Sequence, residues 1–73
     1  MDIQEYIKSW QVSDEQILDR FKNGLNYNLV YNLTTLSVRH EELFNHIIQV
    51  LKQYNLELSN QLLHEVMCNL AGV

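Results

Sequence analysis

Apolar residues recur every three to four positions along most of this chain, which is the spacing of an amphipathic helix with one buried face. The spacing is most regular in residues 41–54, and a shorter stripe with the same period occupies residues 2–10. In the shorter segment, Asp2 and Glu5 are arranged as in a capping box at the start of a helix. Both segments are therefore predicted to be helices.

The clearest start of a helix is the sequence VSDEQI, residues 12–17. Ser13 stands in the N-cap position, and Gln16 completes a capping box three residues later. Gly24 can adopt the left-handed conformation that often follows the end of a helix. We expect this helix to cover residues 13–23.

The last predicted helix has Ser59 as its N-cap and ends at Gly72. Its expected buried face consists of five apolar residues: Leu62, Leu63, Val66, Met67 and Leu70. The start of the helix at residues 41–54 is less well marked. Thr35 and Ser37 are the nearest capping candidates, and neither is decisive.

Residues 25–33, LNYNLVYNL, fit two different periods. All five odd positions are apolar and three of the four even ones are Asn, which is the alternation of a strand with one buried face. The same region also carries one helical stripe: Leu25, Leu29, Leu33 and Leu36. An isolated strand leaves its backbone N–H and C=O groups unpaired, and no second segment of the chain resembles a strand. We therefore predict a helix over residues 26–37, with a possible continuation into the next helix.

The strand is retained as an alternative in which a second copy of the chain supplies the pairing strand. One strand at residues 25–33 would then be followed by two helices, an order similar to that of the ribbon-helix-helix repressors. In that family a two-chain ribbon enters the major groove of DNA. The outward residues of such a ribbon would be Asn26, Asn28, Val30 and Asn32, with no Lys or Arg among them. The family has nothing equivalent to residues 1–23, so we assign no family.

These segments predict a single all-α domain over residues 1–73, a small bundle of four to five short amphipathic helices. A domain of this size buries only about 60% of the surface that its unfolded chain exposes. The one cysteine, Cys68, cannot form a disulfide within the chain. Without such a crosslink, we expect the domain to gain stability as a homodimer.

Composition argues against several classes of function. There is no secretory signal, and no apolar run reaches the roughly 18 residues of a membrane span, so we expect a cytoplasmic protein without a membrane partner. The formal net charge is −4, and the five Lys and Arg residues are scattered singly. Nucleic-acid binders usually display a basic patch, so a nucleic-acid partner is not expected.

Residues that could carry chemistry are few. His64 and Cys68 are four apart, the spacing of two ligands in a metal half-site or of a thiol beside a base. Glu42 and His46 have the same spacing and could pair across one helical turn. No CxxC, HExxH, GxSxG or glycine-rich phosphate loop is present. We interpret the first pair as a solvent-edge histidine beside a core cysteine, and we predict no catalytic residue, no metal and no cofactor.

The aromatic residues are more informative. Trp10 and Phe21 are expected in the core, whereas tyrosines often anchor protein interfaces. The interface candidates are four tyrosines: Tyr6, Tyr27, Tyr31 and Tyr54. We predict a small non-enzymatic protein–protein interaction module that occupies a partner's surface, as a regulator, inhibitor, adaptor or immunity-type protein does. The alternative is a dimeric DNA-binding transcriptional regulator that uses the ribbon at residues 25–33.

Overall fold

The computed structural model describes residues 3–72, with the backbone alone at Ile3, and this part of the chain is all-α. It contains five helices and no strand: α1 (Ile3–Trp10), α2 (Asp14–Asp19), α3 (Tyr27–Arg39), α4 (Glu41–Tyr54) and α5 (Leu56–Ala71). The predicted small bundle is therefore confirmed. The alternative strand at residues 25–33 is wrong, because the backbone is helical from Tyr27 onward. The predicted capping residue Asp2 lies outside the described residues.

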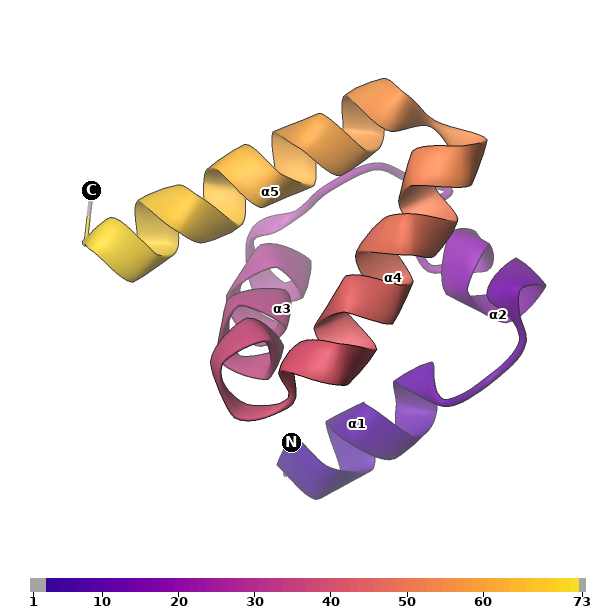
Figure 1. Cartoon of the computed structure of the whole chain (residues 1–73), viewed down its shortest axis with the longest axis horizontal. Helices are drawn as coiled ribbons and strands as arrows, with labels where there is room; N and C mark the ends of the chain where they lie inside the picture. Colours follow the sequence, from indigo (N-terminus) through magenta and orange to yellow (C-terminus); the bar gives the residue numbers. More distant parts are fainter. Residues whose placement is uncertain (1–2, 73) are drawn as a thin grey trace.

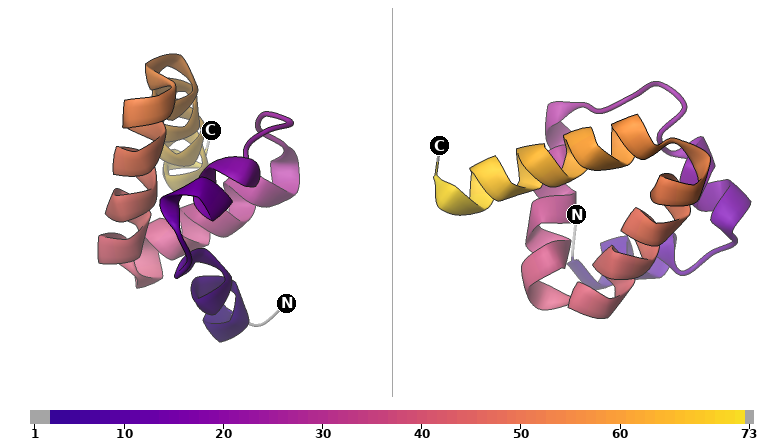
Figure 2. Two further views of the ribbon diagram at one scale, coloured as in Figure 1. Left: turned by 90° about the vertical axis from the view of Figure 1, so that its right-hand side faces the viewer. Right: turned by 45° about the horizontal axis from the view of Figure 1, so that its top comes forward.

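The three longest helices, α3, α4 and α5, pack against one another and form the centre of the molecule. In Figure 1, α4 and α5 meet at an angle and α3 lies behind them. α2 packs against α4, and α1 contacts both α3 and α4, as the two further views in Figure 2 show. The C-terminal end of α5 extends beyond α3. Within residues 3–72, no helix is both long and apolar enough to cross a membrane.

One core joins all five helices. Each helix contributes a side chain with almost no exposed surface: Trp10, Ile17, Leu33, Ile47 and Leu62. Phe21 is also buried, with its ring centroid 5.5 Å from that of Trp10, so both predicted core aromatics are confirmed. Helices shorter than about 12–15 residues are marginal alone in water. The short helices of this chain therefore depend on the shared core for their stability.

The capping box at the start of α2 is confirmed. The Gln16 backbone N–H donates to Ser13 Oγ, and the Ser13 backbone N–H donates to Gln16 Oε1, both at 3.3 Å. The helix itself is shorter than predicted, because it ends at Asp19 and tight turns follow. These turns place Phe21 in the core, and Gly24 has the expected left-handed conformation with φ of 83°.

α3 and α4 are separate helices that meet at His40. α3 runs to Arg39, two residues beyond the predicted end. The hydroxyl of Thr35 donates to the carbonyl of Tyr31, and the Ser37 hydroxyl donates to a carbonyl three residues back, so neither caps α4. This back-bonding within a helix is a common alternative use of Ser and Thr hydroxyls.

The predicted start of α5 at Ser59 is wrong. Its N-cap is Asn55, whose Oδ1 accepts a hydrogen bond from the Leu58 backbone N–H at 3.2 Å. Asn55 also ends α4, so one residue serves both helices. Ser59 lies instead on the inner face of α5, fully buried, and its Oγ has no hydrogen-bond partner among residues 3–72.

The predicted buried face of α5 is correct only in part. Leu62 and Val66 are buried, but Met67 and Leu70 are 64% and 50% exposed. The inner face of the helix is set by the stripe that begins at Ser59, and this stripe turns Met67 outward.

Alanine substitutions at Asn55 and Ser59 test which residue caps α5. Asn55→Ala removes the acceptor for a first-turn amide and is expected to lower the free energy of unfolding by about 1 kcal/mol. Ser59→Ala removes a buried hydroxyl without a partner and is expected to be neutral or stabilising. Urea denaturation followed by circular dichroism measures both variants. A larger loss for Ser59→Ala than for Asn55→Ala would contradict the assignment.

Candidate interaction surface

The exposed apolar side chains of α3 form the tyrosine face, which we define as Tyr27, Tyr31 and Val38. The face follows from where the helix begins. Asn26 caps α3, because its Oδ1 accepts a hydrogen bond from the Leu29 backbone N–H at 2.9 Å. With this start, the helical period that buries the inner stripe of α3 turns the tyrosine face towards solvent.

The two tyrosine rings of this face stack on each other. Their centroids are 6.3 Å apart, and the ring planes differ by 18°. Tyr27 is 80% exposed and Tyr31 is 58% exposed, so both rings are accessible to a partner. Stacked aromatic side chains restrict each other's rotamers. The pair is therefore partly ordered before any partner arrives, which lowers the entropy cost of binding.

A shallow groove of about 260 Å³ adjoins the tyrosine face. Its lining comes from the start of α3 and the facing side of α5: Leu25, Asn26, Tyr27, Val30, Gln61, Glu65 and Asn69. Asn69 Nδ2 also donates to Thr34 Oγ1 at 3.2 Å, which links the two helices beside the groove. Four of the lining side chains are amides or a carboxylate. The groove therefore offers polar groups next to the apolar rings.

The other two tyrosine candidates do not belong to this surface. Tyr54 is 70% exposed, but it lies at the end of α4 and lines a separate depression beside α2. Tyr6 is only 7% exposed, so the expectation that it contributes to a contact surface is wrong. The apolar stripe of α1 that carries Tyr6 faces the core. There the centroid of the Tyr6 ring lies 5.9 Å from the centroid of the Trp10 ring.

Tyr6 belongs to an aromatic cluster at the junction of α1 and α2. Burial raises the pKa of the Tyr6 phenol above its ordinary value of 10.0, and the nearby Trp10 indole and Arg20 guanidinium offset part of that rise. The Arg20 guanidinium carbon lies 4.9 Å from the Trp10 ring centroid, and the same guanidinium donates to the Ser9 carbonyl. The cluster therefore packs α1 against Arg20 and Phe21, which follow α2.

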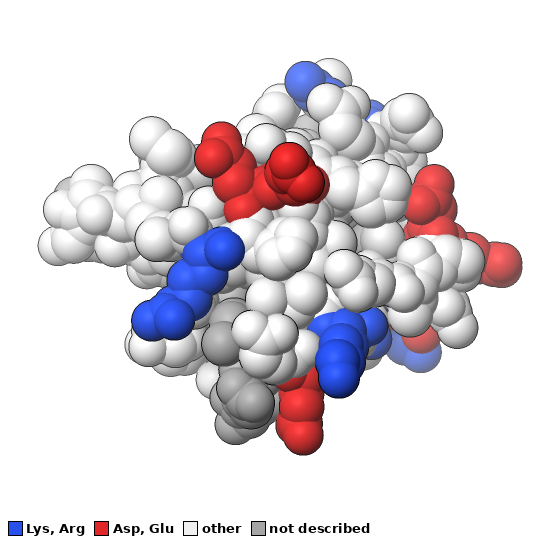
Figure 3. All heavy atoms as spheres, turned by 60° about the horizontal axis from the view of Figure 1, so that its bottom comes forward, with Lys and Arg blue, Asp and Glu red and all other residues white. Residues whose placement is uncertain are grey.

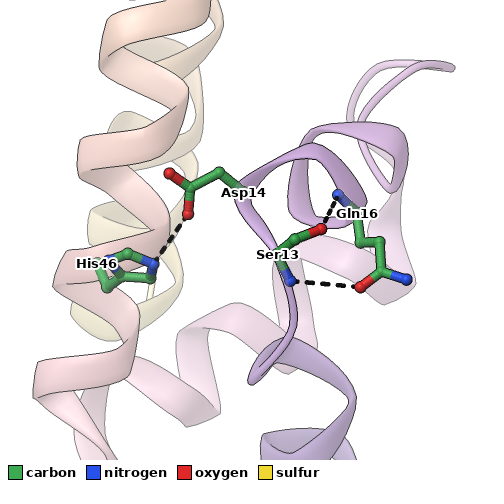
Figure 4. Close-up of polar contacts among 4 residues, drawn as sticks. All are labelled: Ser13, Asp14, Gln16 and His46. Atoms are coloured by element: carbon green, nitrogen blue, oxygen red, sulfur yellow. Dashed lines mark hydrogen bonds and ion pairs between the residues drawn. The ribbon is translucent and has the colours of Figure 1, made fainter.

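Charged groups are dispersed on the face of the molecule shown in Figure 3, where positive and negative side chains are interspersed. His46 Nε2 lies 3.4 Å from Asp14 Oδ1, and this contact joins α4 to α2 beside the Ser13 capping box (Figure 4). The spacing along α4 indicated that His46 could pair with Glu42 across one helical turn. His46 instead reaches across to the packed neighbouring helix, a contact that the spacing along one helix could not reveal.

His64 and Cys68 lie side by side on α5, with 3.7 Å between His64 Nε2 and Cys68 Sγ. His64 is exposed, as predicted for a histidine at the solvent edge, and Cys68 is partly buried, so the prediction of a core cysteine is met only in part. Among the described residues, no three His, Cys, Asp or Glu side chains converge as a metal site would require. One chain thus provides two neighbouring ligand atoms.

Several exposed apolar residues were not anticipated from the sequence, among them Val38, Leu56, Met67 and Leu70. For Met67 and Leu70, the sequence did contain a signal of exposure: no charged residue follows Glu65, so the outward positions near the end of α5 must include uncharged residues. Val38 had a weaker signal, since it lies two turns beyond Tyr31 on the same helical face.

Comparisons with known proteins add no family to this description. No protein-family model matches the chain, and no curated protein or solved structure shows significant similarity to it. The candidate surface must therefore be interpreted from its own geometry.

The raised pKa of Tyr6 predicts how stability changes at alkaline pH. In the unfolded chain Tyr6 ionises near pH 10.0, whereas the folded chain keeps the phenol protonated to higher pH. The stabilising contribution is therefore complete below pH 10.0 and is lost as the pH rises through the folded-state pKa. Tyr6→Phe should reduce the alkaline loss of the free energy of unfolding, measured by urea denaturation at a series of pH values.

The control for this experiment is Tyr54→Phe, which removes an exposed phenol. This variant should lose stability with rising pH as the unsubstituted protein does. An alkaline loss that is the same in Tyr6→Phe and in the unsubstituted protein would contradict the assignment to Tyr6.

Proposed function

We propose that this chain is a small non-enzymatic protein-binding module that acts by occupying a surface of another protein. Regulators, inhibitors, adaptors and immunity-type proteins work in this way. The observation that carries the proposal is the stacked pair of exposed tyrosines on α3, Tyr27 and Tyr31, at the edge of a groove lined by both polar and apolar side chains. The single cysteine, Cys68, is consistent with a cytoplasmic location, because unpaired thiols persist in reducing compartments.

The chemistry of the tyrosine face favours a protein partner. Tyrosine presents a large apolar ring together with a hydroxyl that can donate and accept hydrogen bonds, and it is enriched at the energetic centres of interfaces. The only charged residue within α3 is Arg39, in its last turn. A partner would therefore be held by apolar contact and hydrogen bonding, with little dependence on salt.

The size of the molecule limits the interface. A standard protein–protein interface covers about 800 Å² on each partner. This is roughly one sixth of the 5072 Å² of accessible surface of the chain. The tyrosine face and the adjoining groove can therefore serve one partner while α2 and the outer side of α5 stay accessible.

The DNA-binding alternative has no specific support. It requires a ribbon at residues 25–33, and this segment is helical from Tyr27 onward. The outward side chains of α3 also include no cluster of Lys or Arg that could neutralise phosphates.

Affinity capture with substituted baits tests the proposed surface. The purified protein is used as bait in an extract of its native host, in parallel with the double variant Tyr27→Ala, Tyr31→Ala and with Tyr54→Ala. A specific partner should be lost from the double variant and retained by Tyr54→Ala, which removes an equally exposed tyrosine from a different place. Mass spectrometry identifies the protein that shows this pattern.

The captured partner is then purified and titrated calorimetrically. Each single tyrosine substitution is expected to weaken binding at least about 10-fold, corresponding to about 1.4 kcal/mol, because truncation of a central aromatic residue commonly costs this much or more. Equal affinity for the double variant and the unsubstituted protein would exclude the tyrosine face as the binding site.

A further inference from the structure

The outer side of α5 carries a second stripe that the core does not use. His64, Met67, Cys68 and Ala71 follow one another at i, i+3, i+4 and i+7, which places them on one helical face. The opposite face, with Leu62 and Val66, is buried in the core. His64, Met67 and Ala71 are exposed and Cys68 is partly buried. We call these four residues the outer stripe.

The outer stripe holds two potential metal ligands at a suitable separation. His64 Nε2 and Cys68 Sγ are 3.7 Å apart. With a Zn–S bond of about 2.3 Å and a Zn–N bond of about 2.1 Å, tetrahedral angles separate the two ligand atoms by about 3.6 Å. The two side chains therefore need only a small adjustment to bind one ion together.

One chain cannot complete such a site. Structural zinc is almost always bound by four protein ligands, whereas no third His, Cys, Asp or Glu joins this pair within the described part of the chain. The missing ligands must come from a second molecule. A second copy supplies a matching pair, because an interface with twofold symmetry brings the same residues of both chains together.

We propose that two copies of this chain pair through antiparallel α5 helices and bind one Zn²⁺ with His64 and Cys68 of each copy. The ion then has two nitrogen and two sulfur ligands. Each Cys68 thiol loses its proton to solvent as its sulfur binds, and His64 binds as neutral imidazole through Nε2. Two thiolates balance the charge of the ion, so the completed Cys₂His₂ site carries no net charge.

The shape and charge of α5 fit this pairing. The C-terminal end of the helix extends beyond α3 (Figure 1), and three of the four side chains of the outer stripe are exposed, with Cys68 partly buried. No charged residue follows Glu65, and the projecting end at the left of Figure 3 shows no charged side chain. Met67, which is 64% exposed, gains burial when a second helix packs against the outer stripe.

The inference does not rest on the proposed function, because the tyrosine face belongs to α3 and the outer stripe belongs to α5. In a zinc-linked dimer, each chain would keep its own tyrosine face accessible, so the dimer would present two such faces. A bivalent module of this kind binds a multivalent partner more tightly than one copy does.

Metal titration with the full chain tests the inference. Zn²⁺ is added to the reduced protein, with a phosphine reductant present so that disulfides cannot form, and the molecular mass is measured by sedimentation equilibrium. The expected result is conversion of monomer to dimer, complete at one ion for every two chains and reversed by a chelator. Co²⁺ in place of Zn²⁺ should give the visible absorption of a tetrahedral site and a sulfur-to-metal charge-transfer band.

Four variants locate the site. Cys68→Ser and His64→Gln should each abolish the metal-dependent dimer and the cobalt spectrum, and circular dichroism checks that both remain helical. His46→Gln removes a similarly exposed histidine from α4 and should behave as the unsubstituted protein does. Tyr27→Ala should also retain the zinc dimer, which separates this result from the test of the tyrosine face.

Other outcomes overturn the inference. These are absence of metal binding, binding of one ion to each monomer, a dimer that persists in chelator, or a zinc dimer unaffected by Cys68→Ser and His64→Gln.

Discussion

The mutual packing of α3, α4 and α5 is the constraint on which the rest of the molecule depends. These three helices bury Leu33, Leu51 and Leu62 completely, and each of these residues fixes the rotation of its helix about its own axis. Once the inner stripe of a helix is fixed, its outer face is fixed as well. The exposure of Tyr27 and Tyr31 on α3 and of the outer stripe on α5 therefore follows from the packing of the core.

The same packing leaves apolar surface exposed, because the chain is too small to enclose all of it. Hydrophobic residues make up 47% of the sequence, yet several of the largest stay accessible on α3 and α5. A small domain has a high ratio of surface to volume, so its core has room for only part of its apolar side chains. These side chains gather on two different helices. One face can then bind a partner while the other remains available for a second copy.

The N-terminal helices are attached by more varied contacts. Trp10 inserts into the core, Arg20 covers its ring, and the Asp14–His46 pair links α2 to α4 at the surface. A contact as exposed as this one contributes little free energy, so α1 and α2 are held mainly by their buried side chains, Trp10 and Ile17 among them. The cluster also has a cost. Tyr6 Oη and Trp10 Nε1 are buried without a hydrogen-bond partner among residues 3–72.

The sequence by itself predicted a bundle of four to five helices, the capping box at Ser13 and the core positions of Trp10 and Phe21, because helical periods and caps depend on residues a few positions apart. It also identified the adjacent pair of His64 and Cys68 for the same reason. Only the tertiary structure decided that Tyr6 is buried, that Ser59 is a core residue and that Met67 faces outward. These outcomes depend on which neighbouring helix covers each face, and this is set by contacts between residues far apart in the chain. The spacing of apolar residues within one segment does not show these contacts, because the same stripe can be covered by a neighbouring helix or left exposed to solvent.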